Sequence, residues 1–175
     1  AMYEFIPDIM RKAAEIMLTA HDIDRAVTSK SGDANFVTEY DVAVQNFLEE
    51  KLTEALPHAV IIGEESDDNH TELLSSRVCL IIDPIDGTAN FTHEYRHSCI
   101  SLALFSYGEA VFSAVYNPYQ DELFSATKGG GAFVNGRKIQ VAERDFAHSI
   151  VAFGTSPYYK HTLGEKTFKL ANALY

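Results

Sequence analysis

An apolar run that ends abruptly in two carboxylates constrains this chain more than any other stretch. Residues 79–82, Cys-Leu-Ile-Ile, are typical of a buried strand. Asp83 and Asp86 follow with a proline between them, and Gly87-Thr88 then suits a tight turn at the start of a helix. The pattern therefore predicts a strand that carries negative charge to the edge of a sheet.

Two carboxylates crowded at a strand end repel each other unless a cation lies between them. A hard divalent ion would relieve this repulsion. The N–H groups of Gly87, Thr88 and Ala89 would face outward at the start of a helical turn, where an anion is favoured. The stretch therefore predicts adjoining cation and anion sites, as phosphate chemistry requires. A structural turn capped by Asp86 is the alternative.

A second predicted strand also ends in acidic residues. Ala59–Ile62 is typical of a short buried strand, and Gly63-Glu64-Glu65-Ser66 follows it directly. Two neighbouring strands would deliver their carboxylates at one edge of the sheet. We therefore expect Glu64 to reach a site shared with Asp83 and Asp86.

Apolar residues at helical spacing predict one helix over Tyr3–Ala20 and a second that runs to Pro57. Thr38, with Asp41 three residues later, is a plausible start for the second helix. The carboxylate of Asp41 would be stabilised there by the helix dipole. Asp41 either caps this helix or takes part in the site, and the sequence leaves both interpretations open.

The second half of the chain predicts a meander of strands. The run 99–105 is apolar on both faces, as in an interior strand, and four further strand candidates follow it at 110–116, 122–126, 131–134 and 138–142. Asn135-Gly136 is a strong hairpin signal. Ser149–Gly154 predicts one more strand, and a helix is expected from Leu163 onward. The expected fold class is α/β of the layered α+β kind, with two N-terminal helices packed on a largely antiparallel sheet.

Composition and charge limit the possible partners. A chain of 175 residues that is 46% hydrophobic and 22% charged is typical of one soluble globular domain. Its net charge of −11 disfavours nucleic acid and anionic membranes, so a phosphorylated partner would be small and held by a bound metal. No signal peptide or membrane span is evident, which favours a cytoplasmic location. Cys79 and Cys99 lie in apolar runs typical of reduced, buried thiols.

One pattern competes with this interpretation. His93-Glu94-Tyr95-Arg96-His97 matches the His-Glu-x-x-His pattern of zinc proteases, which needs both imidazoles on one helical face. Too few residues separate Gly87 from the strand at Cys99 for the long helix that such a site uses. We therefore do not expect zinc here.

Four motifs, taken in order, resemble the inositol monophosphatase family. They are Lys30 leading to Val37-Thr38-x-x-Asp41, then Gly63-Glu64-Glu65-Ser66, then Asp83-Pro84-Ile85-Asp86-Gly87-Thr88-x-Asn90-Phe91, and Gly129-x-Gly131-Ala132-Phe133-x-Asn135-Gly136. The resemblance covers almost the whole chain. It implies layers of helices and antiparallel sheets, and a phosphomonoesterase that depends on magnesium, with manganese as a possible substitute. Members of the family are often inhibited by lithium and are commonly dimers, so a homodimer is expected.

The resemblance also implies residue roles. Glu64, Asp83, Asp86 and the backbone carbonyl of Ile85 would hold magnesium. Thr88, hydrogen-bonded to Asp41, would orient and deprotonate the attacking water together with Glu64. The residues implied to contact the substrate are Glu64, Asp86, Gly87, Thr88 and Ala89.

The sequence departs from the family pattern in three places. Asn35 stands where many members have Asp, and Ala89 stands where a second Thr is usual. The family's C-terminal Trp-Asp motif, whose aspartate completes a metal site, is missing, so residues 1–175 are expected to form a single incomplete domain, truncated at the C-terminus.

The residue pattern and the resemblance lead to two hypotheses about function. The first is hydrolysis of a small phosphate monoester, such as inositol monophosphate or a related sugar phosphate. The second is a catalytically impaired form that binds metal or phosphate in a regulatory role. Nucleotide 3′-phosphates and fructose bisphosphate are hydrolysed by relatives and remain further alternatives.

Overall fold

The computed structural model describes residues 3–23, 27–29, 36–64, 78–152 and 160–174. Within these ranges the helices are α1 (Ile6–Leu18), α2 (Glu39–Ala55), α3 (Thr88–Thr92) and α4 (Lys160–Leu174), with a short 3-10 helix at Phe146–His148. The strands are β1 (Val27–Ser29), β2 (Phe36–Thr38), β3 (Val60–Gly63), β4 (Val78–Asp86), β5 (Cys99–Ser106), β6 (Glu109–Asn117), β7 (Glu122–Thr127), β8 (Gly131–Val134) and β9 (Arg137–Ile139).

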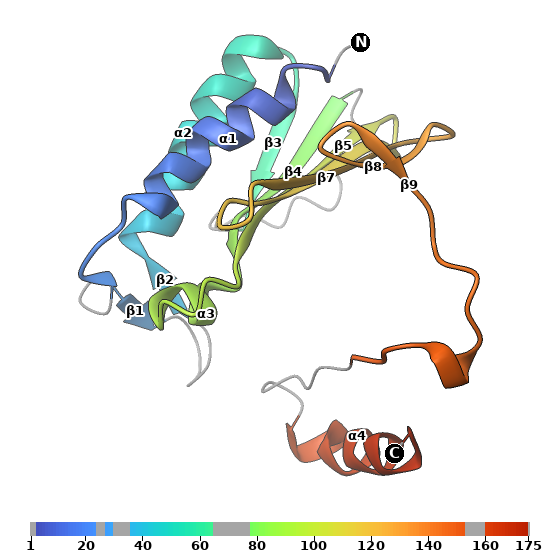
Figure 1. Ribbon diagram of the computed structural model, residues 1–175. Coiled ribbons are helices and arrows are strands. Elements are labelled where there is room, and N and C mark those ends of the chain that lie inside the picture. Colours follow the sequence, from blue (N-terminus) through green and yellow to red (C-terminus); the bar gives the residue numbers. More distant parts are fainter. Residues whose placement is uncertain (1–2, 24–26, 30–35, 65–77, 153–159, 175) are drawn as a thin grey trace.

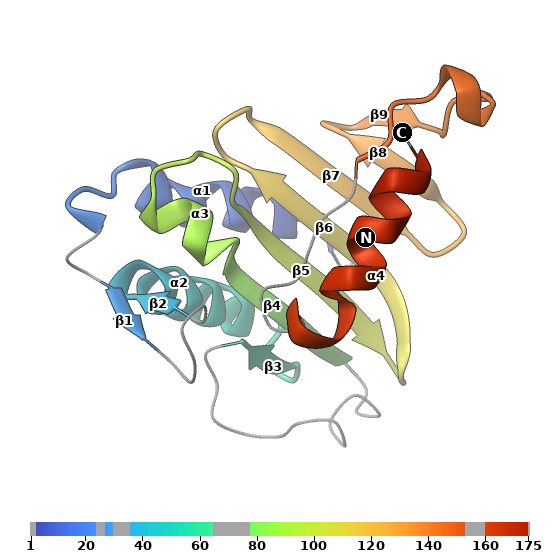
Figure 2. The ribbon, with the colours of Figure 1, turned by 90° about the horizontal axis from the view of Figure 1, so that it is seen from below.

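Strands β3 to β9 form a seven-stranded sheet in sequence order, and β1 and β2 form a separate antiparallel pair (Figure 2). Within the large sheet only β3 and β4 run parallel, because every other neighbouring pair is antiparallel. The predicted meander is therefore confirmed. The parallel pair aligns Gly63 with Ile82, which brings the ends of β3 and β4 to one edge of the sheet.

Helices α1 and α2 lie side by side along one face of the sheet (Figure 1). The alternating residues Ile100, Leu102 and Leu104 of β5 are almost fully buried in the core. On the opposite face Val115 and Phe124 remain 40% and 41% exposed. The main core thus lies between the sheet and the two N-terminal helices, as the predicted fold class requires, while α4 stands apart from the sheet in Figure 1.

The turn between β8 and β9 is the tight hairpin that Asn135-Gly136 predicts. Both residues have positive φ, 46° and 77°, which the paired turn requires. The side-chain oxygen of Asn135 accepts the Leu123 N–H at 2.9 Å, and its amide nitrogen donates to the Asp121 carbonyl at 2.7 Å. Asn135 therefore also ties this turn to the start of β7.

The strand predicted at Ser149–Gly154 is wrong over the residues that the structure describes there. Ser149–Ala152 is extended chain outside any sheet, and Ile150 is 97% exposed. Residues 153 and 154 lie outside the described residues. A β-prone apolar run forms a strand only beside a partner strand, and β9, which would be nearest in sequence, ends early at Ile139.

Because the core lies on one face of the sheet, alanine substitutions on its two faces should lower the free energy of unfolding by different amounts. Leu80 is fully buried in the cluster beneath the helices, so Leu80→Ala should lower the free energy of unfolding by about 2–5 kcal/mol. Val115→Ala, on the open face, should cost less than about 1 kcal/mol. Urea denaturation measures both, and equal losses would show that the two faces of the sheet are buried alike.

Candidate active site

Four acidic residues, Glu64, Asp83, Asp86 and Asp41, lie near the ends of β3 and β4. Glu64 follows β3, and its N–H donates to the Ile82 carbonyl at 3.1 Å, which fixes it against β4. The pairing of β4 with β5 becomes irregular between Asp83 and Asp86, where proline supplies no N–H. The regular pairing of the sheet therefore stops at the same residues that carry the carboxylates. Asp41 approaches them from the first turn of α2.

Asp83 has the most perturbed environment of the four. Burial, followed by the charges of Glu64 and Asp86, raises the pKa of Asp83 from 3.8 to about 8. Its Oδ1 atom is buried and has no hydrogen-bond partner among the described residues. A buried oxygen without a partner, next to other carboxylates, is costly unless a cation or a proton neutralises it.

The donor set fits a divalent cation in chemistry and charge. All candidate ligands are oxygens, which Mg²⁺ and Ca²⁺ prefer over nitrogen or sulfur. In the described part of the chain no three His, Cys, Asp or Glu side chains converge closely enough to share one ion as they stand. A cation bound among these carboxylates would offset both the burial and the neighbouring charges that raise the pKa of Asp83.

Asp41 caps α2 with one carboxylate oxygen and contacts Thr88 with the other. Its Oδ2 accepts the N–H of Thr38 at 2.7 Å and the Thr38 hydroxyl at 2.5 Å, which completes a capping box. Its Oδ1 accepts the Thr88 hydroxyl at 3.1 Å. Asp41 is only 1% exposed, and this burial raises its pKa despite the hydrogen bonds that favour the ionised form.

The hydroxyl of Thr88 has two possible acceptors. It lies 3.1 Å from Oδ1 of Asp41 and 3.0 Å from the carbonyl oxygen of Ile85. Because a hydroxyl has one proton, Thr88 donates to only one of them at a time. The Ile85 carbonyl, which sequence analysis assigns to the metal, keeps a free lone pair in either case.

Gly87 is required by the backbone at the turn into α3. Its φ is +91°, and a Cβ atom would lie 3.0 Å from the His97 carbonyl oxygen. The Asn90 side chain donates to that same carbonyl at 2.8 Å and holds the loop against the turn. The first N–H groups of a helix have no partner within it, so Thr88 and Ala89 begin α3 with donors available to an anion.

A pocket of about 360 Å³ opens beside Asp86 and Gly87. Cys99 lies on its wall, with its thiol 3.9 Å from Oδ2 of Asp86. Burial, and then the charge of Asp86, raises the pKa of this thiol to about 11, so it stays protonated. Both cysteines are free thiols, as predicted.

Some residues singled out in the sequence cannot be placed, and one sequence pattern does not form the structure that it would need. Lys30, Asn35 and Glu65 lie outside the described residues. Residues 93–97 form turns rather than a helix, so the zinc-protease pattern lacks the helical face that it needs. Sequence analysis missed the bracing role of Asn90 and the thiol beside Asp86, because neither contact follows from a spacing rule.

The raised pKa of Asp83 predicts a pH dependence in metal-free buffer. The folded state keeps the Asp83 proton up to about pH 8, whereas the unfolded chain releases it near 3.8. The associated stability is therefore fully present below pH 4 and is lost as the pH rises through 8. Asp83→Asn, which cannot ionise, should gain stability relative to the wild type over this window in urea titrations with EDTA. A difference that does not change with pH would contradict this environment for Asp83.

Two glycines separate the effects of steric contact and backbone conformation. Gly129 also has positive φ, 74°, but a Cβ atom there would meet nothing within 4 Å. Gly129→Ala should therefore cost about 1–2 kcal/mol for conformation alone. Gly87→Ala should cost more, because the His97 carbonyl must also move. If urea denaturation gives the two variants equal losses, the turn at Gly87 is looser than described.

The family model for the inositol monophosphatase family matches residues 1–174 of the chain. An inositol monophosphatase of Dictyostelium discoideum is 38% identical over 135 residues, which cover 77% of this chain and 50% of that protein. The chain spans about half the length of the curated relatives it matches.

Solved structures give the same result. The suppressor protein SuhB of Bartonella henselae superimposes with a TM-score of 0.71 at 33% identity, over 79% of this chain and 54% of that one. An IMPase of Thermotoga maritima superimposes with a TM-score of 0.72 at 33% identity, over 80% and 53% of the two chains. Sequence and fold agree that the chain belongs to the inositol monophosphatase family.

Proposed function

We propose that this chain carries the catalytic core for magnesium-dependent hydrolysis of a small phosphate monoester, with inositol monophosphate as the first candidate. One observation carries the proposal. Asp83 is half-buried beside Glu64 and Asp86, and its buried Oδ1 atom has no hydrogen-bond partner among the described residues. The hydrogen-bonded pair of Thr88 and Asp41 lies in the same cluster. This combination supplies a site for a cation beside a group that can accept a proton.

The relatives support this choice of metal and substrate. Curated relatives are named inositol monophosphatases. A structure at 28% identity, with a TM-score of 0.64, is described as an IMPase/NADP phosphatase complexed with Mg²⁺ and phosphate. Another, from Staphylococcus and also 28% identical, is described as an inhibitory complex soaked in LiCl. These descriptions make Mg²⁺ the first ion to test, with Mn²⁺ as its substitute, and lithium the first inhibitor.

Four groups of this chain would hold the ion: Glu64, Asp83, Asp86 and the Ile85 carbonyl. A divalent ion bound there would lower the pKa of the attacking water and offset the negative charge on the departing alcohol oxygen. Binding of the ion would be favoured because it relieves the repulsion between these carboxylates.

Side chains of the protein would carry out the proton transfer. The Thr88 hydroxyl passes its proton to Asp41 and accepts one from the attacking water, with Glu64 helping to orient that water. A carboxyl whose pKa is raised by burial is a better proton acceptor than a solvated one, and Asp41 has this property. The N–H groups of Gly87, Thr88 and Ala89 would receive the phosphate oxygens, while Asp86 lines the pocket open to the rest of the substrate.

A non-catalytic form that binds metal and phosphate uses the same residues and is the second candidate. The chain spans about half the length of the relatives that it matches, so the activity of those whole proteins is a proposal here. Turnover and binding must therefore be measured separately.

The net charge of −11 supports a small substrate rather than nucleic acid. In the described residues no helix is both long and apolar enough to cross a membrane. We extend the proposal to a homodimer in the cytoplasm, and light scattering after size exclusion tests the dimer through its mass.

Thr88 offers a matched test of the proton-transfer step. Thr88→Ala should lower magnesium-dependent phosphate release from inositol monophosphate at least about a hundredfold, whereas Thr88→Ser, which keeps the hydroxyl, should stay within about tenfold. Thr92→Ala removes a hydroxyl from the same helix, and within the described residues that hydroxyl donates only to the Ala89 carbonyl. This variant should leave the rate unchanged.

Calorimetric titration with Mg²⁺ and with inorganic phosphate accompanies the rate assay. If the wild-type chain binds both ligands and releases no phosphate, the binding function replaces the catalytic one. If Thr88→Ala keeps the wild-type rate, the role of the Thr88–Asp41 pair is wrong even where hydrolysis occurs.

A further inference from the structure

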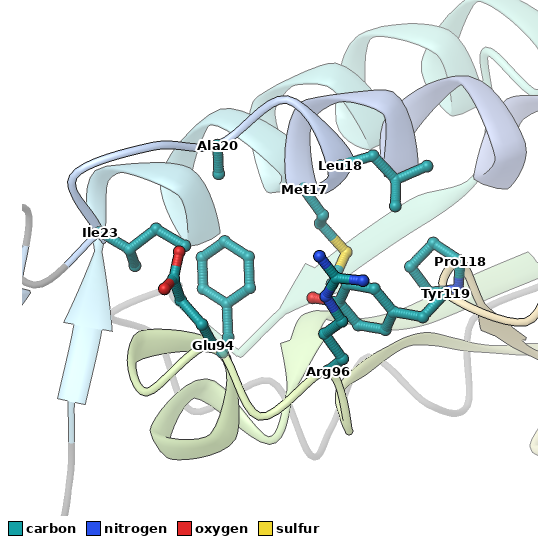
Figure 3. A pocket seen from close by; sticks show the side chains of 9 residues that line it. Met17, Leu18, Ala20, Ile23, Glu94, Arg96, Pro118 and Tyr119 are labelled. Carbon is teal, nitrogen blue, oxygen red and sulfur yellow. The ribbon is translucent and has the colours of Figure 1, made fainter.

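A second pocket, of about 270 Å³, is lined by other residues than the acidic cluster (Figure 3). It is enclosed by the end of α1, the loop that follows α3 and the turn between β6 and β7. The residues that line it are Met17, Leu18, Ala20, Ile23, Phe91, Glu94, Arg96, Pro118 and Tyr119. None of the proposed metal or catalytic residues is among them, so the proposed hydrolysis does not account for this pocket.

The floor of the pocket is apolar and well packed. Phe91, Met17 and Ile23 are 1%, 3% and 7% exposed, so their side chains are held by the core. Tyr40 packs edge-on against Phe91, with ring centroids 5.8 Å apart. Ala20 leaves space where a larger side chain would stand. A preformed apolar floor of this kind suits a small aliphatic or aromatic group.

The rim of the pocket carries opposite charges. Glu94 lies toward Ile23, whereas the guanidinium of Arg96 lies between Met17 and Tyr119 (Figure 3). Neither side chain forms an ion pair with any residue that the structure describes, including the other. Two exposed side chains of opposite charge, without an ion-pair partner among the described residues, therefore border one hollow.

The backbone holds this arrangement at a cost. Glu94 and Arg96 have φ of 52° and 54°, in the left-handed region that non-glycine residues rarely adopt. Each such residue costs about 1–2 kcal/mol. Tyr95 between them is 70% exposed and does not line the pocket. Conformations of this kind persist where their surroundings enforce them and occur often at ligand sites.

We propose that this pocket binds a small zwitterion with an apolar side chain, which in chemical class is an α-amino acid. The carboxylate would pair with Arg96, and the ammonium would pair with Glu94. The apolar side chain would rest on Leu18 and Ala20, which line the pocket and keep accessible surface. A sugar phosphate fits poorly, because Glu94 repels a second negative charge and the floor offers no polar partner.

L-Leucine, L-methionine and L-phenylalanine are the probes, measured by saturation-transfer NMR and calorimetry on the full chain. Isocaproate lacks the ammonium of leucine and isoamylamine lacks its carboxylate. Since each exposed ion pair contributes modestly, we expect each analogue to bind at least about fivefold more weakly than leucine.

Substitutions of Arg96 and Glu94 test the two proposed ion pairs with the ligand. Arg96→Gln should weaken leucine at least about fivefold and leave isoamylamine unchanged, whereas Glu94→Gln should weaken leucine and leave isocaproate unchanged. Ala20→Phe should fill the pocket and abolish binding of all the probes. Arg144→Gln is the control, because it removes an exposed arginine that does not line the pocket.

Two results would overturn the proposal. One is the absence of saturable binding by all three amino acids to the folded wild-type chain. The other is leucine binding that persists undiminished in both Arg96→Gln and Glu94→Gln, two rim variants whose exposed side chains the core does not need. Neither outcome depends on phosphatase activity, so the proposed function can fail or stand independently.

Discussion

Repulsion among carboxylates at the ends of β3 and β4 is the constraint on which the rest of the site depends. The parallel pairing of these two strands and the bond from Glu64 to Ile82 fix where the charges lie. The proline of β4 interrupts the ladder at the same point. Among the described residues the fold gathers acids at one edge and leaves Oδ1 of Asp83 without a hydrogen-bond partner, so a bound cation would stabilise it.

The same region shows why stability and function cannot be separated here. Asp41 caps α2 through Thr38 and meets the Thr88 hydroxyl through its other oxygen. Helix α2 packs on β4, so its start is held against the strand that carries Asp83. Loss of the Asp41 carboxylate would therefore weaken a helix start and remove an acceptor of the Thr88 hydroxyl together. The capping signal in the sequence was also a signal of the site.

Much of this could be predicted from the sequence, because local patterns specify it. Helical spacing, the Thr38 cap and the Asn-Gly hairpin each act over a few residues. The meeting of Glu64 with Asp83 followed from two strands that end in acids. The strand expected at Ser149–Gly154 failed because strand formation needs a partner that local sequence does not reveal. The pocket around Arg96 was not foreseen, since three segments distant in sequence form it.

The ionisation of Asp83 tests the central claim most directly. Carboxyl carbon NMR, with the Asp83 resonance assigned by loss in Asp83→Asn, measures its pKa in metal-free buffer and again with saturating Mg²⁺. The account predicts a pKa near 8 without metal and a large fall when Mg²⁺ binds, because the ion replaces the proton as the neutralising charge. An Asp83 pKa near 4 in both conditions would contradict it, since the carboxylates would then need no cation.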